Sequence, residues 1–387
     1  MTGGGKPTLL YVSPVVPLLT GNGLAMRAGT VLEFLAQFYA VSLLVVRLYP
    51  PFNTAIPKVF QRMCQRTAII DPHGRSWWST LPFGRWLNPA TKYRRHRFDV
   101  VHVFRLATVS HAREFLAKVN GRAAHLDLDD IESTTHTRIA QLCYANGNDP
   151  AGRHEEWQSQ QCRAAEQEAF RSFDRIYVCS ENDRETLKHR VGVELCVLPN
   201  VVRLPEAPSA ESGRNLLFVG TLGYYPNDDA ARYLCEEIVP RASSQSSAGF
   251  RVNIVGPGAS RELMKAASAD RVQGIVSLRG CVADLEPWYR DAGVVVVPVR
   301  AGGGTRIKIL EAFSYLRPVV TTSAGIEGID ALHDEHVLIG DTPEEFAHHC
   351  VRLMGHSELR RRLAANAWDL LNERYSMEAL KRPSAAI

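Results

Sequence analysis

Short apolar runs alternate with longer amphipathic stretches along the whole chain, and this alternation restricts the fold more than any other feature. Parallel strands that are buried on both faces read as continuous apolar runs, and crossover helices join them. The pattern therefore predicts an α/β protein with two doubly wound, Rossmann-like sheets. The predicted strands are 8–12, 41–46, 100–104, 123–128, 176–179 and 195–198 in the first half, and 215–219, 252–255, 276–278, 294–297, 319–321 and 336–339 in the second.

The length of 387 residues exceeds what one hydrophobic core usually supports, so two domains are expected. The segment 201–214 is polar and contains Pro205, Pro208 and Gly213 between the two strand series. Such composition is typical of a linker. We therefore place the domains at 1–203 and 204–387.

Positive charge is concentrated in one part of the first half. The net charge is only +4, but 47–97 holds ten Lys or Arg against one acid, Asp71, together with three tryptophans. Basic and aromatic residues together favour an interface, so 62–97 could contact a membrane surface or an acidic acceptor. An ordinary solvated surface with buried tryptophans is the alternative. We expect no nucleic-acid partner.

The eight cysteines include no Cys-x-x-Cys pair and no cluster at zinc-ligand spacing. The first residues lack the apolar stretch of a signal peptide, and no apolar run reaches the roughly 20 residues of a spanning helix. We therefore expect a reduced, cytoplasmic protein without a metal site, whose contact with the inner face of a membrane would be peripheral.

A glycine-rich turn follows one of the buried strands. The strand 294–297 is followed by Gly302, Gly303 and Gly304, and a helix is predicted to start near Thr305. Glycines let a backbone approach an anion closely, and the amides of a first helical turn carry partial positive charge. The turn therefore suits the two phosphates of a nucleoside diphosphate.

Two cations, Arg306 and Lys308, stand beside that turn. They would stabilise the negative charge that develops as a nucleoside diphosphate leaves, which makes them the main catalytic candidates. A flexible loop followed by a solvated helix start is the alternative interpretation.

The stretch that follows resembles the retaining, GT-B-fold glycosyltransferases of family four, also described as group 1. Glu311 is followed by Ala312-Phe313, by 318–320 (Pro-Val-Val) and by 325–328 (Gly-Ile-Glu-Gly). The resemblance implies a cleft between two Rossmann-like domains, with the acceptor on the first and a nucleotide-sugar on the second. It further implies retention at the anomeric carbon, and that Glu311 accepts hydrogen bonds from the donor ribose.

The chain departs from this family pattern at two positions. Gly303 stands where the family often has a first Glu, which contacts the transferred sugar, and Thr221 stands where it tends to have an Arg. We infer that Arg306 and Lys308 supply the missing positive charge.

Three more positions in the second half and at the linker fit a nucleotide site less specifically. Gly220 ends a strand, and the stretch 278–282, which ends at Val282, resembles the segment whose backbone meets the nucleobase. Asn200 stands where the family has its Pro-Asn-Gly-Val pattern, which is expected near the hinge and the donor. An ordinary turn or strand-to-helix loop is the alternative for Gly220 and Val282.

In the first half, Gly21 and Gly23 follow the first strand, and the resemblance makes them a loop that faces the cleft. A structural turn is the alternative. His102 and Arg105 flank the end of the strand 100–104, where His102 is either catalytic or a core histidine. A helix is expected over 24–36.

The acidic stretch 125–132 follows another strand of this half. Its Asp127-x-Asp129 spacing could suggest a metal clamp, but the cations already named make a metal unnecessary, and we predict no cofactor. Asp129 or Asp130 could instead deprotonate an acceptor or bind a cationic one. Capping of the next helix through Ser133 or Asp130 is the alternative.

The sequence thus predicts transfer of a sugar from a nucleoside diphosphate to a glycan, a lipid-linked or a small-molecule acceptor in carbohydrate biosynthesis. Such transfer needs leaving-group stabilisation more than a protein nucleophile. A nucleotide-sugar epimerase of the same fold is one rival. A catalytically silent homologue that only binds a nucleotide-sugar is another, and Gly303 is its best support.

Overall fold

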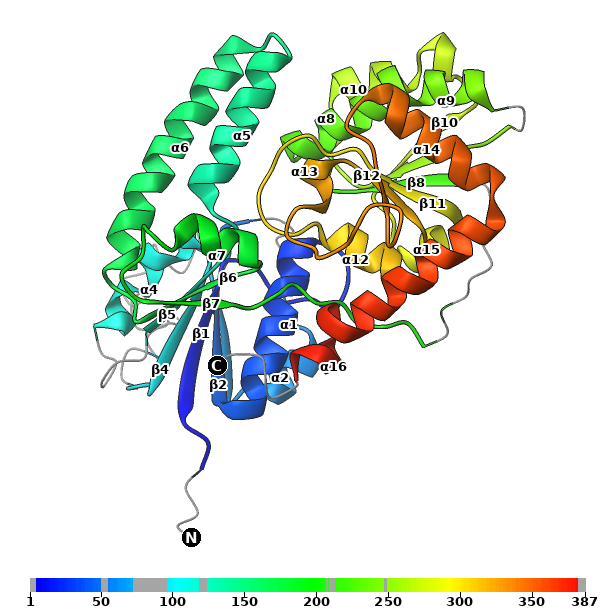
Figure 1. Cartoon of the computed structure of the whole chain (residues 1–387). Helices are drawn as coiled ribbons and strands as arrows, with labels where there is room; N and C mark the ends of the chain where they lie inside the picture. Colours follow the sequence, from blue (N-terminus) through cyan, green and yellow to red (C-terminus); the bar gives the residue numbers. More distant parts are fainter. Residues whose placement is uncertain are drawn as a thin grey trace. The chain divides into compact units, whose positions relative to one another are not determined.

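The computed structural model describes residues 5–49, 55–71, 93, 96–117, 124–206, 208, 213, 215–246 and 249–381. Contacts divide the chain into two compact units, each with its own sheet, with the main break after Pro199 (Figure 1). By the same division the segment Thr134–Ser159 groups with the second unit. The domain limits 1–203 and 204–387 stay a prediction. Each unit is built around one parallel sheet.

The sheet of the first unit has the order β3-β2-β1-β4-β5-β6-β7 among the described strands, all of them parallel. Its strands are β1 (Thr8–Ser13), β2 (Ala40–Val46), β3 (Arg66–Ile70), β4 (Val100–Phe104), β5 (Ala124–Asp129), β6 (Arg175–Val178) and β7 (Glu194–Val197). The sequence prediction missed β3, which lies in the basic segment and has no fully buried residue.

Helices of the first unit follow the strands in the expected alternation. They are α1 (Gly23–Phe38), α2 (Lys58–Met63), η3 (Leu106–Thr108), α4 (Val109–Leu116), α5 (Glu132–Ala145), α6 (Asp149–Phe170) and α7 (Glu181–Leu187), of which α5 and α6 extend into the second unit. Helix α1 packs against β2 and α2, and α4 packs against β4. The helix α1 begins where Asn22 accepts hydrogen bonds from the amides of Leu24 and Ala25.

The two faces of this first sheet differ in polarity, because successive residues of a strand point to opposite sides. On one face Leu10, Val12, Leu44 and Val46 join a wholly apolar cluster. The other face carries buried polar side chains as well, among them His102.

The sheet of the second unit has the order β10-β9-β8-β11-β12-β13 among the described strands, again parallel. Its strands are β8 (Asn215–Val219), β9 (Val252–Val255), β10 (Val276–Gly280), β11 (Ala292–Val297), β12 (Val319–Thr321) and β13 (Leu338–Ile339). Strand β11 lies between β8 and β12 and is buried along its whole length, which fits its run of four valines.

Helices cover this second sheet as well. They are α8 (Tyr225–Tyr233), η4 (Leu234–Ile238), α9 (Val239–Gln245), α10 (Arg261–Ala267), η5 (Asp270–Val272), α11 (Glu286–Asp291), α12 (Ile307–Ser314), α13 (Ser323–Ile326), α14 (Pro343–Gly355), α15 (Ser357–Leu370), η6 (Leu371–Tyr375) and α16 (Met377–Leu380). Helix α14 packs against β11, β12 and α9 (Figure 1). Within the described ranges, no helix has the length and apolar character needed to cross a membrane.

Candidate active site

The glycine-rich turn lies at the carboxyl end of β11, in the second unit. Gly302 and Gly304 adopt φ values of 133° and 63°, which L side chains rarely adopt. Helix α12 begins at Ile307 with Arg306 as its N-cap, so the predicted start near Thr305 was two residues early. Ligands of open α/β sheets bind at the carboxyl ends of the strands, which is where this turn stands.

Arg306 folds back onto the turn that precedes it. Its Nη1 donates hydrogen bonds to the carbonyl oxygens of Gly303 and Gly304, the latter at 2.7 Å. Its Nη2 is buried and has no hydrogen-bond partner among the described residues. A Cβ at Gly302 would lie 3.0 Å from this nitrogen, so the absence of a side chain at 302 gives the guanidinium its room.

Lys308 reaches from α12 to the carboxyl end of β8. Its ammonium donates to Asn227 Oδ1 at 2.7 Å and lies 4.6 Å from the ring centroid of Phe218. Within the described part of the chain, no carboxylate lies at ion-pair distance from this ammonium. Burial, helped by the charge of Arg306, lowers the pKa of Lys308 to about 7.

The backbone leaves room for this ammonium because of one glycine. A Cβ at Gly220 would lie 2.8 Å from Lys308 Nζ and 3.0 Å from Asn227 Cγ. The ammonium of α12 thus lies next to the turn that contains Thr221, and its role in supplying the positive charge absent there stays a prediction. A partly buried ammonium without a carboxylate partner is a site that an anion would stabilise.

Glu311 lies one turn further along α12. Its carboxylate accepts a hydrogen bond from the hydroxyl of Tyr289 at 3.1 Å, and Tyr289 stacks on Tyr315 at a centroid distance of 5.0 Å. Burial raises the pKa of Glu311 to about 7, against the opposing effects of the Tyr289 hydrogen bond and the Lys308 charge. Lys308 and Glu311 are three residues apart, and this spacing places the cation and the carboxyl group on the same side of α12.

The other predicted nucleotide-binding positions are distributed around this centre. Asn200 donates through Nδ2 to Thr305 Oγ1 at 2.7 Å, so the structure brings these two together. The amide of Gly220 donates to the carbonyl of Val255 at 3.0 Å. Val282 follows β10 and precedes α11, the helix that carries Tyr289. Their roles toward a nucleotide stay predictions.

His102, a catalytic candidate from the sequence, lies in the interior of the first unit. Its side chain is 0% exposed, and its ring packs 5.5 Å from each of Tyr11 and Tyr177 and 5.9 Å from His125. Burial and the neighbouring His125 hold the pKa of His102 well below its usual range, so the ring is neutral. This is the position of a core histidine, and a part in catalysis stays a prediction.

The acidic stretch at the end of β5 is neutralised by two arginines. Arg27 of α1 donates from Nη2 to Asp127 at 2.7 Å and lies 3.4 Å from Asp129 through Nε. Arg105 contacts Asp129 at 3.4 Å and also pairs with Asp130. Burial raises the pKa of Asp129. Arg105 and Asp129 both have positive φ, of 70° and 64°.

The carboxylates that suggested a metal clamp are thus paired with Arg27 and Arg105. The described residues contain no group of three or more His, Cys, Asp or Glu arranged to hold a metal ion. Ser133, considered as a helix cap, lies inside α5, and its hydroxyl donates to Glu166 at 2.7 Å. Gly21, with φ of 104°, and Gly23, the first residue of α1, form the turn before that helix.

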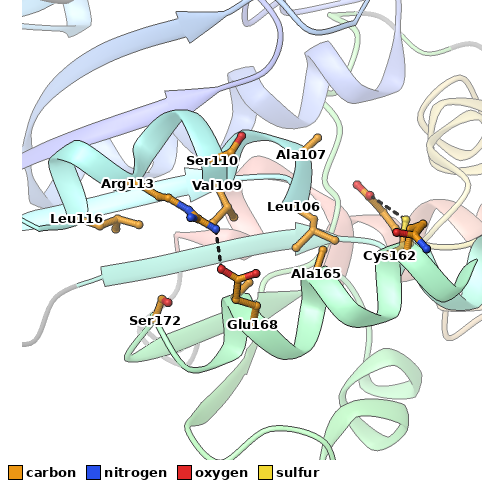
Figure 2. A pocket seen from close by; sticks show the side chains of 13 residues that line it. Leu106, Ala107, Val109, Ser110, Arg113, Leu116, Cys162, Ala165, Glu168 and Ser172 are labelled. Carbon is orange, nitrogen blue, oxygen red and sulfur yellow. Dashed lines mark hydrogen bonds and ion pairs between the residues drawn. The ribbon is translucent and has the colours of Figure 1, made fainter. Parts of the chain in front are cut away.

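A cavity of about 600 Å³ lies in the first unit between α4 and the inner half of α6 (Figure 2). Its apolar lining includes Leu106, Val109 and Ala165, and Arg113 and Glu168, which form an ion pair at 2.6 Å, line it as well. None of the predicted site residues lines this cavity. The basic segment 62–97, a candidate for membrane contact, lies largely outside the described residues.

Comparison with known proteins finds a family match within the second unit. Residues 213–356 match the family model of glycosyl transferases group 1. This range contains Gly220, the glycine turn, Arg306, Lys308 and Glu311. A protein of Klebsiella pneumoniae, described as an uncharacterized 44.6 kDa protein in the cps region, is 27% identical over 167 residues, which are 42% of each chain.

Solved structures resemble the chain over almost its whole length. Sucrose-phosphate synthase from Thermosynechococcus elongatus has a TM-score of 0.70 at 16% identity, covering 97% of this chain and 96% of that chain. HepE of Anabaena in complex with UDP-glucose has a TM-score of 0.67 at 15% identity. TarM of S. aureus has a TM-score of 0.68 at 11% identity, and both alignments cover 97% of this chain and 97% of the other. The fold is therefore GT-B, which confirms the predicted fold class.

Proposed function

We propose that the chain is a glycosyltransferase that takes its sugar from a uridine diphosphate donor. The observation that carries the proposal is the ammonium of Lys308, which has no carboxylate partner within the described residues and lies beside Gly220 at the carboxyl end of β8. The match of 213–356 to glycosyl transferases group 1 and the UDP-glucose in the HepE structure support this donor.

In the proposed reaction the diphosphate lies between the glycine turn and Lys308. The ammonium neutralises the charge that develops on the β-phosphate oxygen as the bond to the sugar breaks, an effect worth roughly a hundredfold in rate for comparable electrostatic donors. Arg306 holds the carbonyls of Gly303 and Gly304, and its unpartnered Nη2 gives a second donor toward the phosphates. Glu311 accepts hydrogen bonds from the ribose. No metal is required in this scheme, and retention is part of the proposal.

The acceptor is proposed to be a glycan, a lipid-linked sugar or a small molecule, handled in the cytoplasm or at the inner face of a membrane. A structure of a TarM mutant from S. aureus is in complex with UDP and alpha-GlcNAc-glycerol, which supports a sugar-bearing acceptor. Asp129, held by two arginines, is the proposed base in the first unit. Its raised pKa moves it toward the range of a general base at neutral pH.

Thermal unfolding in the presence of nucleoside diphosphates tests the donor. Binding to the native state stabilises it by about 2.7 kcal/mol at a hundredfold excess over Kd. We expect UDP, and UDP-sugars as a class, to raise Tm by several degrees, and Lys308→Ala to remove most of this rise. No rise with any nucleoside diphosphate would overturn the proposal.

Chemistry is tested by release of UDP from a panel of donors, with and without sugar acceptors. Transfer releases UDP in proportion to the acceptor consumed. An epimerase would change the donor sugar without releasing UDP, and a catalytically silent homologue, which Gly303 favours, would bind UDP and release none from any donor. Lys308→Ala should lower turnover by roughly a hundredfold, more than it weakens donor binding.

A further inference from the structure

The glycine turn has a second support, which comes from a distant part of the chain. Arg138 lies on α5 in the segment Thr134–Ser159, which belongs to the second unit. Its Nη1 donates to the carbonyl oxygen of Gly302 at 3.1 Å and to Glu327 Oε2 at 2.5 Å. Its Nη2 donates to Glu327 Oε1 at 2.8 Å. One guanidinium therefore joins the turn to the segment that follows α13.

The partner carboxylate is itself held near the end of β11. Glu327 directly follows α13, whose N-cap is Thr322. Thr322 also donates to the carbonyl of Val299, and Thr321 donates to that of Val297, so both threonines attach this segment to the strand that leads into the turn. Through Arg138, the segment at Glu327, which is attached to β11, is linked to Gly302, the first glycine of the turn.

Three consecutive glycines need such support, because their backbone loses more freedom on ordering than that of any other residue. Fixing the backbone of one residue opposes folding by about 1–2 kcal/mol. Arg306 orders the second half of the turn through the carbonyls of Gly303 and Gly304. Arg138 orders the first glycine through its hydrogen bond to the carbonyl of Gly302.

The geometry of the pair makes it stronger than an ordinary surface ion pair. Exposed pairs contribute little, but two parallel bonds from one guanidinium to both oxygens of a carboxylate fix direction as well as distance. The side chains of Arg138 and Glu327 are 36% and 27% exposed, so solvent screens the pair only in part.

We propose that Arg138 is a positioning residue of the donor site, which keeps the turn at Gly302 in the conformation that receives the diphosphate. The proposal rests on the proposed function, because it assumes that the turn binds the donor phosphates. Arg138 acts through the Gly302 carbonyl and through Glu327, and it does not itself contact the phosphates.

The test compares Arg138→Ala and Arg138→Lys with the unchanged full-length chain. We expect Arg138→Ala to raise the Kd of UDP and the KM of the sugar donor together by about tenfold, as loss of a charge-assisted bond does. Arg138→Lys keeps a charged donor but cannot form the two parallel bonds to Glu327, so its affinity for UDP should lie between those of Arg138→Ala and the unchanged chain. Hydrogen–deuterium exchange in the peptide over Gly302–Thr305 should rise severalfold in Arg138→Ala and fall again when UDP is added.

Two further variants separate positioning from folding. Arg153→Ala changes an exposed arginine of α6 in the same hairpin and should leave Kd, KM and exchange unchanged. Glu327→Gln keeps the Gly302 contact of Arg138, so its effect on Kd should be smaller than that of Arg138→Ala. A purely structural role would lower Tm and the yield of active protein without moving Kd or KM.

The outcomes distinguish this inference from the proposed function. If the unchanged chain binds UDP and Arg138→Ala binds it equally well with unchanged exchange at the turn, the positioning role is wrong and the proposed function stands. If the unchanged chain binds no nucleoside diphosphate, the proposed function is wrong. An equal loss in Arg153→Ala would also overturn the positioning role.

Discussion

Lys308 and Glu311 show how burial prepares ionisable side chains for a ligand. The pKa of Lys308 falls to about 7 and that of Glu311 rises to about 7, in both cases mainly because the charged form is desolvated. Neither side chain has an ion-pair partner of its own within the described residues. A bound nucleotide would offer phosphate oxygens to the first and ribose hydroxyls to the second.

This arrangement predicts that UDP binding takes up protons at pH 8. In the free protein Lys308 is mostly neutral at that pH, because its pKa is about 7. A nearby diphosphate favours the ammonium and raises this pKa, while Glu311, also with a pKa of about 7, is already ionised and contributes little. Calorimetry in buffers of different ionisation enthalpy should show uptake of a substantial fraction of one proton.

Lys308→Arg is the control for this proton uptake. Arginine keeps its charge at all accessible pH values, so uptake at pH 8 should vanish even where binding persists. Proton uptake that is unchanged in Lys308→Arg would show that another group titrates.

The buried pair of Arg27 and Asp127 carries a prediction on stability. Arg27 donates to Asp127 at 2.7 Å and to the carbonyl of Leu198 at 3.1 Å, and the side chains of the pair are 0% exposed. Arg27→Met leaves a buried carboxylate without its partner, which should lower the free energy of unfolding by about 3–5 kcal/mol. Urea denaturation measures this loss.

The double variant Arg27→Met with Asp127→Leu tests the cause of that loss. Replacing both charges by apolar groups removes the unpaired carboxylate, so part of the lost stability should return. A double variant that is less stable than Arg27→Met would contradict this explanation.

At the residue scale, the sequence alone could identify side chains next to a local motif. Lys308 and Glu311 follow the glycines closely, and such spacing is visible without a structure. Asn227, Tyr289 and Arg138 were not predicted, since they approach the turn only after the chain has folded: Lys308 and Asn227 are 81 residues apart, and Arg138 and Glu327 are 189 apart. The sequence left two interpretations of His102, catalytic or core, because a position in a strand does not show how deeply that face of the sheet is buried.

Among the elements, buried parallel strands were predicted best. The runs 100–104, 215–219, 252–255 and 319–321 match the observed strands, because strands covered on both faces are continuously apolar. Strand β3 was missed because its residues are at most partly buried and its first two, Arg66 and Thr67, are polar, which leaves an apolar run of only three. Helix α6 begins at Asp149 with polar turns that show no apolar stripe, so its start leaves no periodic signal in the sequence.

The turn after β8 gives a prediction at this scale. Gly220→Ala places a Cβ 2.8 Å from Lys308 Nζ and 3.0 Å from Asn227 Cγ, so these flexible side-chain ends must move away. Because they can move, the free energy of unfolding should change by less than about 0.5 kcal/mol, the usual range for a surface substitution. UDP affinity should fall by about tenfold or more, because the ammonium is displaced.

Gly223→Ala in the same turn is the matched control. Its Cβ would have no neighbour closer than 3.9 Å, so UDP binding should be unchanged. Equal losses in the two variants would mean that any rigidification of the turn impairs binding, and the displacement of Lys308 would not be the cause.

Over the whole molecule, the alternation of strands and helices was sufficient to predict two parallel sheets. The sequence did not predict that Thr134–Ser159, part of the hairpin of α5 and α6, groups with the second unit. Within that unit the segment makes single polar contacts such as Arg138 with Glu327 and Asn146 with Asp229, the latter at 2.8 Å. Such contacts leave no periodic signal, because each needs only one residue at one position.

The division into two units predicts where a bound nucleotide protects the chain from hydrogen exchange. A ligand that binds only the native state lowers exchange most where it suppresses local opening. The proposed contacts of UDP lie in the second unit, at Gly220, along Gly302–Glu311 and through Tyr289 on α11. We expect protection in peptides over these positions and over Arg138, whose contact with Gly302 couples α5 to the turn. Peptides of β1 and β2 should exchange at unchanged rates, since none of the proposed contacts lies there. Protection confined to the first unit would mean that the nucleotide binds elsewhere, and the roles assigned to Lys308 and its neighbours would be wrong.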